Sequence, residues 1–549
     1  MQNFQTGSMQ QFPLMISSIL EHAAVAHGDQ EIVSRLVEEP LWRYNYSGLA
    51  ERAGRAANMI RRLGIGTGDF VSTLAWNTHR HYELFFAVPG IGAVLHTGNP
   101  RLSDEQIAYT LNHAGSSVLL FERNFSELVQ RLQPHLTNIR HFIMLAADDL
   151  PDMPGIELQG YEQLLAQEEA LLEWPSFDEN AGAILCYTSG TTGNPKGVLY
   201  SHRSIVLHAL AAGLASAFNF SAFDCIMPCS SLYHGTAWGV PFAAAINGCK
   251  FVLPGDRMDG ESLQELIQNE GVTFSGGVPT IWTMYLDHLE RTGEDAGELK
   301  QLIIGGSAVP RAMAEAFHNK YGVSVRQLWG MTETSPLGVV ATPTPKLVSL
   351  GEEAVNDVIW SRQGRLQYGI ELKVVDEQGN RLPADGKSAG TLMVRGPWVV
   401  ERYFRSETSA LDADGWFDTG DIATLDENGF MRITDRIKDV IKSGGEWVSS
   451  IDIENAAVAH PGVRLAAVVG VYHPKWEERP LLIIESHPGA EVSKAAMLAH
   501  LEGRIVKWWM PDDMIVDTIP LTATGKIDKK VLRERYYNYL TEQQLQAQA

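Results

Sequence analysis

The stretch at residues 187–198 brings together residue types that suit a polyphosphate ligand. Its glycines allow the backbone to bend tightly and to approach a bulky group closely. The polar residues are Thr188, Ser189, Thr191, Thr192 and Lys196, and the glycines are Gly190, Gly193 and Gly197. Backbone N–H groups, hydroxyls and one ammonium concentrated in a single loop are typical of a phosphate site.

A Walker A loop is the first alternative, and it requires the pattern Gly-x-x-x-x-Gly-Lys-Ser/Thr at the start of a helix. Here Lys196 follows Pro195 and precedes Gly197, so that pattern is not met. The second alternative is an ordinary surface loop, because such loops are commonly rich in glycine and hydroxyl residues. The apolar run at residues 183–187 indicates a buried strand that leads into the loop.

Length and composition bound the class of protein. With 549 residues, the chain is too long for one small core, and two or more domains are expected. Its net charge of -22 argues against a nucleic-acid surface, but a local basic patch could still hold an anionic cofactor. The N-terminus lacks a signal-peptide pattern and no apolar run reaches about 18 residues, so we expect a soluble cytoplasmic protein without a membrane span. Cys186, Cys225, Cys229 and Cys249 show no zinc-binding pattern, which indicates buried, reduced thiols.

Helical and strand patterns alternate before and after the loop, which predicts a mostly parallel sheet flanked by helices. Expected helices span residues 16–27, 49–63, 104–113, 161–172 (on the surface), 201–218 (capped by Ser201) and 311–321 (stopped by Gly322). Expected strands span residues 70–76, 117–121, 183–187, 302–304, 323–328 and 371–375. The strand ends at residues 305–306 and 329–333 open into polar loops, where α/β sheets bind ligands.

The pattern changes toward the C-terminus. Shorter strands and turns begin near residue 364, and the charged stretch 432–439 precedes a new alternating region. We therefore expect an α/β protein with a large N-terminal domain, residues 1–435, and a small α+β domain, residues 436–549. Helices are expected in the small domain near residues 451–460 and 494–507.

Six segments together resemble the motif set of the acyl-adenylate-forming superfamily. They are residues 188–196, 329–333, 417–421, 435–436, 442–446 and 524–526, and their order and spacing cover nearly the whole chain. That superfamily contains acyl-CoA synthetases, adenylation domains of peptide synthetases and beetle luciferases. A closer resemblance is to bacterial medium- and long-chain fatty acid–CoA ligases and methylmercaptopropionate–CoA ligases. Residues 99–102, 197–204 and 443–447 carry it.

The resemblance implies a reaction in two steps with ATP, Mg²⁺ and coenzyme A as cofactors. ATP first converts a carboxylate to an acyl-AMP, and pyrophosphate leaves; coenzyme A then attacks the acyl-AMP. The catalytic residues would be Lys526, which bridges the carboxylate and the α-phosphate, His234 beside the carboxylate, and Glu333. Glu333 would hold Mg²⁺ together with Thr188, because hard cations prefer oxygen ligands. Lys438 would be the hinge about which the small domain rotates between the steps.

The resemblance also assigns the nucleotide and coenzyme A contacts. Trp329 would offer adenine a flat face where the superfamily commonly has Tyr, and a core Trp is the alternative interpretation. Asp421 would accept hydrogen bonds from the ribose hydroxyls and Arg436 would donate to them. The other cofactor-binding candidates are Thr188, Ser189, Gly190, Thr191, Thr192, Lys196, Gly306, Gln327, Gly330, Thr332, Lys442, Gly444, Gly445 and Trp447.

The acyl site departs from the pattern of close relatives. Residues 231–239 stand where those relatives have Pro-Met-Phe-His-Val-Asn-Ala-Trp-Gly, and the smaller Gly235 and Thr236 replace Val and Asn. This change is expected to widen or reshape the acyl pocket. By resemblance, the pocket is lined by His234, Trp238, Gly305, Gly306, Gly330 and Pro336.

We expect a medium- to long-chain fatty acid as the substrate, with 3-methylthiopropionate or an aryl-alkanoate as the alternative. A luciferase-like oxygenase, an adenylation enzyme serving a carrier protein, and a non-catalytic ligand sensor are competing classes. The resemblance also implies small-molecule partners only and a possible homodimer.

Overall fold

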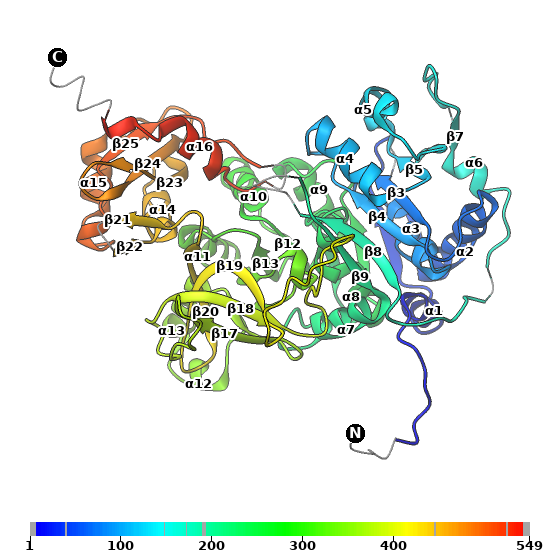
Figure 1. Ribbon diagram of the computed structural model, residues 1–549, viewed down its shortest axis with the longest axis horizontal. Helices are drawn as coiled ribbons and strands as arrows, with labels where there is room; N and C mark the ends of the chain where they lie inside the picture. The colour runs from blue at the N-terminus through cyan, green and yellow to red at the C-terminus, as the bar shows by residue number, and fades with distance from the viewer. Residues whose placement is uncertain are drawn as a thin grey trace.

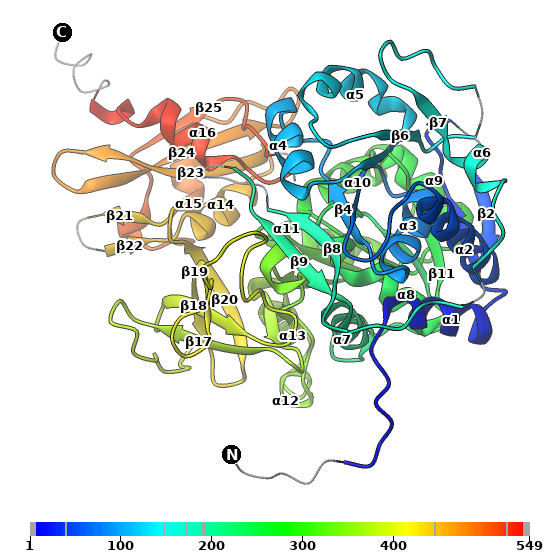
Figure 2. The same cartoon turned by 45° about the vertical axis from the view of Figure 1, so that its right-hand side comes forward.

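The computed structural model describes residues 7–38, 41–147, 149–171, 173–188, 194–443, 446–522 and 525–541. Figure 1 shows a large body, coloured blue to yellow, and a smaller orange and red body that holds the C-terminal residues. Figure 2 shows the same division in a turned view. The predicted α/β fold with a large first part and a small second part is confirmed. Within the described ranges, every helix is too short or too polar to cross a membrane.

A sheet of 13 strands forms the centre of the large body. Its strands are β1 (Glu31–Ser34), β2 (Trp42–Asn45), β10 (Cys225–Pro228), β11 (Lys250–Leu253), β12 (Phe274–Gly277), β13 (Gln301–Gly305), β14 (Ser324–Trp329), β15 (Val339–Val340), β16 (Gly364–Leu366), β17 (Glu371–Val375), β18 (Gly390–Arg395), β19 (Phe417–Leu425) and β20 (Phe430–Arg436). They lie in the order β17-β18-β19-β20-β16-β15-β14-β13-β12-β10-β11-β1-β2. The run from β14 to β1 pairs in parallel, and the strands on either side pair antiparallel.

A second sheet of seven strands completes the large body, in the order β7-β6-β5-β3-β4-β8-β9. Its strands are β3 (Phe70–Leu74), β4 (Val94–Gly98), β5 (Val118–Phe121), β6 (His141–Met144), β7 (Leu158–Gly160), β8 (Gly182–Tyr187) and β9 (Gly197–Ser201). All pairs are parallel except β8 with β9. The antiparallel pair brackets the phosphate-loop candidate, because β8 ends at Tyr187 and β9 begins at Gly197.

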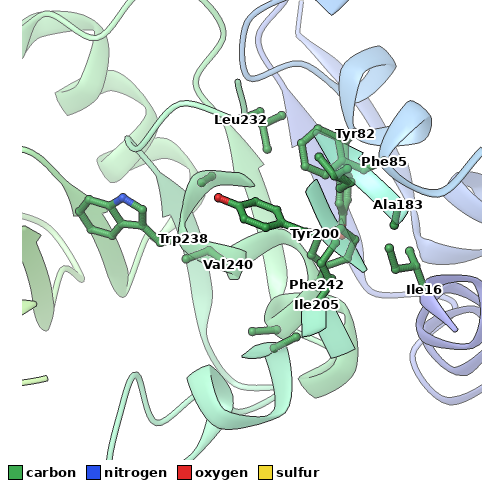
Figure 3. Close-up of a cluster of buried hydrophobic side chains, with 14 of the residues drawn as sticks. Ile16, Tyr82, Phe85, Ala183, Tyr200, Ile205, Leu232, Trp238, Val240 and Phe242 are labelled. Atoms are coloured by element: carbon green, nitrogen blue, oxygen red, sulfur yellow. The ribbon is translucent and has the colours of Figure 1, made fainter. Parts of the chain in front are cut away.

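Helices cover these sheets because nearly every parallel connection needs a crossover, which is usually a helix. They are α1 (Ile16–Ala26), α2 (Tyr46–Arg62), α3 (His79–Gly90), α4 (Asp104–Ala114), α5 (Ser126–Leu132), α6 (Tyr161–Leu165), α7 (His202–Gly213), α8 (Val240–Asn247), α9 (Gly260–Glu270), α10 (Pro279–Thr292), α11 (Arg311–Tyr321), α12 (Pro345–Val348) and α13 (Glu352–Ser361). The main core contains residues of several of these helices and of both sheets. Figure 3 shows Tyr82 of α3, Phe242 of α8 and Tyr200 of β9 in this core, with Trp238 at its edge.

The small body is built on a sheet of five strands. Its elements are β21 (Ile441–Ser443), β22 (Glu446–Val448), α14 (Ser450–Val458), β23 (Val463–His473), β24 (Glu477–Ser486), α15 (Lys494–Leu501), β25 (Asp513–Val516) and α16 (Lys529–Tyr536). The large sheet ends at Arg436 and the small sheet begins at Ile441. The expected boundary after residue 435 falls one residue before the end of β20, and the chain changes sheets between Arg436 and Ile441.

Three predicted helices differ from the structure in extent. The helix expected on the surface at residues 161–172 is limited to α6. Its first residue, Tyr161, is fully buried, and the Tyr161 hydroxyl donates to Glu83 Oε2 at 2.7 Å. The helix expected at residues 201–218 begins after the Ser201 cap as predicted but ends at Gly213. The helix expected at residues 494–507 ends at Leu501, just before Gly503 adopts a left-handed φ of 76°.

The four cysteines are free and buried, as predicted. Burial raises the pKa of the thiols Cys225 and Cys229 to about 12. Thiols with such a high pKa are nearly all protonated near neutral pH, and the thiolate is the reactive form. These cysteines therefore fill the core.

Candidate functional site

The turn after β13 brings the two bodies together. Gly306 has a left-handed φ of 87°, and a Cβ there would lie only 3.5 Å from Lys526 Cε. A side chain at this position would thus be strained, and its Cβ would be in van der Waals contact with the lysine. Gly525, the residue before Lys526, also approaches the large body, since a Cβ there would be 3.1 Å from Thr280 Oγ1 of α10. Figure 1 shows the red segment that leads into α16 running towards α10.

A cavity of about 680 Å³ lies between the two bodies at this point. Gly306, Arg436 and Lys526 border it, together with residues of α10, α11 and α14. Its volume is in the range of pockets that bind small molecules.

Trp329, Asp421 and Arg436 form a second group beside the same turn. Trp329 Nε1 donates to Asp421 Oδ2 at 2.8 Å, and Arg436 Nε lies 3.3 Å from Asp421 Oδ1. Asp421 and Arg436 face each other because β19 and β20 pair at these residues. The carboxylate is therefore held in one orientation, which suits an acceptor of ribose hydroxyls.

The ring of Trp329 is largely covered by its neighbours. Only 7% of Trp329 is exposed, and a Cβ at Gly338 would lie 2.5 Å from its ring. In this structure, Trp329 mainly orients Asp421 through its indole N–H. Stacking on adenine stays a prediction.

Glu333 is the buried carboxylate of the site. It is 7% exposed, and Tyr403 donates its hydroxyl hydrogen to Glu333 Oε1 at 2.8 Å. Burial raises the pKa of Glu333, while the hydrogen bond from Tyr403 and the charges of Arg436 and Lys196 oppose this shift. A buried carboxylate such as Glu333, with Arg436 and Lys196 in electrostatic range, suits a divalent metal that is bound partly by the phosphates of a nucleotide.

The donor set fits Mg²⁺ bound partly by the nucleotide. Within the ranges that the structure describes, no three His, Cys, Asp or Glu side chains cluster as a metal site. Mg²⁺ in phosphate-transfer sites is usually bound by one or two carboxylates and by substrate phosphates. Glu333 would supply the protein carboxylate in such a site.

Tyr403 is a site residue that the sequence reasoning missed. Its hydroxyl contacts Glu333, and Lys196 Nζ lies 4.7 Å from the centre of its ring. Tyr403 therefore connects Lys196, the lysine of the phosphate-loop candidate, to Glu333. It lies about 70 residues beyond Glu333, and no local pattern around it predicted the contact.

The phosphate-loop candidate is described only at its two ends. The Thr188 N–H donates to the Lys196 carbonyl at 2.9 Å, and the Lys196 N–H donates to Thr188 Oγ1 at 3.2 Å. These bonds close the base of the loop. Ser189, Gly190, Thr191 and Thr192 lie outside the described residues. Nearby, Tyr200 donates its hydroxyl hydrogen to the Thr332 carbonyl at 2.7 Å, which ties β9 to the turn that carries Glu333.

Lys526 has an unusual electrostatic environment. Burial and the charge of Arg436 lower the pKa of Lys526 to about 8, against the opposite effects of Asp421 and Glu333. The lysine is therefore poised to lose its proton near the upper end of the physiological range. An oxygen-rich ligand would favour its charged form.

This pKa predicts how adenylation depends on pH. Lys526 is protonated below about pH 8 and neutral above it, so kcat/KM for ATP in the adenylation step should fall as the pH rises through that value. His234 does not cause this fall, because burial and the charge of Lys526 lower its pKa to about 4. Lys526→Arg keeps its charge far above pH 8 and should move the fall to higher pH. An unchanged profile in Lys526→Arg would assign the fall to another group.

The acyl-site candidates lie in a strained segment. Residues 235–239 all have left-handed φ angles, of 52°, 52°, 50°, 60° and 70°. For a residue other than glycine this conformation costs about 1–2 kcal/mol, and Thr236, Ala237 and Trp238 all adopt it. Such strain is concentrated at functional sites in proteins. The segment directly follows His234 and directs Trp238 towards Gly276 of β12, where a Cβ would lie 3.5 Å from the ring.

The small residue at position 235 does not by itself open the pocket. A Cβ at Gly235 would lie 3.0 Å from Pro336 Cγ, so Pro336 fills the space that a larger residue would take. Pro336 also packs on Gly330, where a Cβ would lie 1.8 Å from the Pro336 carbonyl oxygen. Gly305 packs against Leu328 of the neighbouring strand in the same manner. These contacts bring Gly235, Gly330 and Pro336 together, as the predicted pocket wall requires.

Some predicted residues are not brought to this site. Gln327 Nε2 donates to the Trp360 carbonyl, and Gln327 Oε1 accepts from Gln363. The side-chain amide of Gln327 is therefore bonded to α13 and to the residues just after it. Lys442 is exposed on β21, next to the edge strand β22 that contains Trp447. Gly444 and Gly445 lie outside the described residues. Of the candidates in the small domain, the described residues therefore place Lys526, and not Lys442, at the Gly306 turn.

The comparisons agree with the geometry. The family described as AMP-binding enzyme matches residues 20–404, and the AMP-binding enzyme C-terminal domain matches residues 452–526. Among solved structures, an anthranilate CoA ligase in complex with anthranoyl-AMP has the same fold, with a TM-score of 0.85 at 23% identity over 96% of this chain and 99% of that one.

Curated relatives are similar over nearly their whole length. The 3-methylmercaptopropionyl-CoA ligase of Ruegeria lacuscaerulensis is 46% identical, covering 97% of this chain and 99% of the relative. The medium-chain-fatty-acid–CoA ligase of Ectopseudomonas oleovorans is 43% identical, with 97% and 98% covered. The long-chain-fatty-acid–CoA ligase of Thermus thermophilus is 44% identical, with 96% of each covered. The chain therefore belongs to the AMP-binding enzyme family.

Proposed function

We propose that this chain, an AMP-forming acid–CoA ligase, converts medium- to long-chain fatty acids to their CoA thioesters. Its cofactors are ATP, Mg²⁺ and coenzyme A. The observation that carries the proposal is the placement of Lys526 at the Gly306 turn of the large body, close enough to Asp421, Arg436 and Glu333 for their charges to act on its pKa. One mobile cation is thus set among fixed groups that suit a nucleotide.

In the first half-reaction, a carboxylate oxygen of the acid attacks the α-phosphorus of ATP. The bond from that phosphorus to the bridging oxygen breaks, and pyrophosphate leaves with the electron pair. Negative charge grows on the non-bridging oxygens, so donors fixed in place beforehand lower the barrier most. Lys526 supplies the donor to the carboxylate and α-phosphate, and Lys196 neutralises the leaving pyrophosphate. Mg²⁺, held by Glu333, adds charge stabilisation when it is bound.

In the second half-reaction, the thiolate of coenzyme A attacks the acyl carbon. The bond between that carbon and the phosphate oxygen breaks, and AMP leaves. Lys526 has no role in this step. We expect the small body to pivot at Lys438, so that the β21–β22 hairpin with Lys442 and Trp447 replaces Lys526 near the acyl group.

Medium- and long-chain acids are favoured by the relatives named for them, at 43% and 44% identity. The second candidate is 3-methylthiopropionate, because relatives at 46% identity are named 3-methylmercaptopropionyl-CoA ligase. The space between the segment 235–239 and Pro336 will determine the length of acyl chain that the site accepts.

A panel of acids tests the substrate class. We expect kcat/KM for coenzyme A-dependent AMP release to be at least about tenfold higher for C8, C12 or C16 acids than for the C4 acid, since each buried methylene contributes about 0.8 kcal/mol. Methylthiopropionate and a cinnamate complete the panel. A maximum at methylthiopropionate would transfer the proposal to the second candidate. Light emission or O₂ uptake would indicate the oxygenase class.

Three further features belong to the proposal. We expect a cytoplasmic location, and a homodimer by analogy with the superfamily. We also propose that residues 1–435 and 436–549 move as separate domains.

A further inference from the structure

A buried ion pair lies three residues beyond Lys526. Lys529 Nζ is 2.7 Å from Glu454 Oε1 and donates to Ser450 Oγ at 2.6 Å. Both side chains of the pair are nearly buried, at 12% and 13% exposure. Glu454 Oε1 also accepts from the Val468 N–H at 2.7 Å. One ammonium thus connects the start of α16 to α14, and through Glu454 to β23.

The same cluster reaches across the predicted hinge. The Ser450 N–H donates to Asp435 Oδ2 at 2.8 Å, and Ser449 donates its hydroxyl hydrogen to the Thr434 carbonyl, also at 2.8 Å. Asp435 is 1% exposed and belongs to β20, the last strand of the large sheet. The start of α14 comes after Lys438 in the chain. A rotation at Lys438 must therefore separate Asp435 from Ser450.

Charge holds the cluster together. Burial lowers the pKa of Lys529, but the carboxylates of Glu454, Asp435 and Asp439 outweigh this effect and raise it. Lys529 is therefore charged at every physiological pH. Without its ammonium, the carboxylates of Glu454 and Asp435 would remain buried without their common cation.

Lys529 also anchors the segment that presents Lys526. Thr522 donates its N–H to the Lys526 carbonyl, and the Asp528 N–H donates to the Pro520 carbonyl at 2.8 Å. The two ends of this hairpin thus meet at Asp528, the N-cap of α16, and Lys529 follows as the first residue of that helix. Lys526 and Lys529 are three residues apart, and three residues of chain span at most about 11 Å. A shift of Lys529 therefore also shifts Lys526.

We propose that Lys529 is a positioning residue for adenylation, which acts by holding Lys526 at the Gly306 turn. It does so by binding Glu454 and Ser450, while Asp435 fixes α14 to the large sheet. This inference rests on the proposed function, because it assigns Lys529 to only one of the two half-reactions. Misplacement of a reacting group by about 1 Å can cost a factor of 100 in rate.

The test compares the two half-reactions in Lys529→Met, which keeps an unbranched side chain only one atom shorter and removes its charge. Acyl-AMP formation in a single turnover should fall about 10- to 100-fold, while thioester formation from supplied acyl-AMP stays within about threefold of the wild type. Lys530→Met is the matched control, because Lys530 is the exposed neighbour. It should leave both rates unchanged. Lys529→Arg keeps the charge and should recover most of the adenylation rate.

A double variant, Lys529→Met with Glu454→Gln, removes both charges, so no buried charge of the pair is left unpaired. It should keep the thioester rate and still be slow in adenylation. Because an unfolded fraction lowers both rates equally, the ratio of the two rates is the quantity to read. Equal loss of both half-reactions, or an adenylation rate in Lys529→Met equal to that of Lys530→Met, would overturn the positioning role. Failure of the wild type to form any acyl-AMP would instead reject the proposed function.

Discussion

Lys526→Ala should lower the rate of acyl-AMP formation by about 10²- to 10³-fold, the usual cost of losing one preorganised transition-state donor. The structure gives the reason, because the lysine lies at the Gly306 turn, close enough to Asp421 and Glu333 for their charges to act on its pKa. Without it, the charge that grows on the α-phosphate loses its mobile cation. Thioester formation from supplied acyl-AMP should stay near the wild-type rate, because that step does not use Lys526.

Rapid-quench measurements of each half-reaction with the same preparation would check this prediction. Lys530→Ala is a suitable control, since it removes an exposed lysine four residues away. We expect no change in either rate for that control. Loss of both half-reactions to the same extent in Lys526→Ala would contradict the division of labour between the two steps.

Lys438→Pro should slow thioester formation by at least about tenfold and change adenylation by less than about threefold, because proline fixes φ near −65°. The residue lies between the last strand of the large sheet and the first strand of the small one. The turn around it is tight, since the N–H groups of Asp439 and Val440 both donate to the Arg436 carbonyl. Lys526 already lies at the Gly306 turn in this structure, so we expect the variant to slow only a later change of arrangement.

Glu427→Pro is the matched control for this variant. Glu427 is exposed in the tight turn that joins β19 to β20, where proline is well tolerated. Both half-reactions should keep their wild-type rates in this control. Equal slowing of the two half-reactions by Lys438→Pro would show that the hinge lies elsewhere.

The fold was predictable wherever local patterns decide it. The Ser201 cap of α7 is an example, because its hydroxyl accepts from the Ser204 N–H and Ser204 reciprocates. The stop of α11 at Gly322 is another, since glycine readily takes the left-handed φ of 69° found there. The end of α7 was not predictable in this way. Leu210 and Leu214 extend the apolar pattern, but they are 48% and 46% exposed.

The site was predictable as a set of residues but not as a set of contacts. The motifs identified Lys526, Glu333, Asp421 and Arg436, because their residue types match the chemistry of a phosphate activation. The hydrogen bond from Trp329 to Asp421 joins β14 to β19. These two strands are distant in sequence and come close only in the folded sheet. The contacts of Tyr403 and of the Lys529 cluster depend on tertiary packing in the same way. No periodicity in the sequence contains that information.

The most direct test of the account is acid-dependent exchange of pyrophosphate into ATP by the purified protein in the absence of coenzyme A. The account predicts that exchange occurs with a fatty acid and Mg²⁺, and that Lys526→Ala nearly abolishes it, because acyl-AMP forms before the thiol is needed. Thioester production without any such exchange, for every acid that serves as a substrate, would contradict the account.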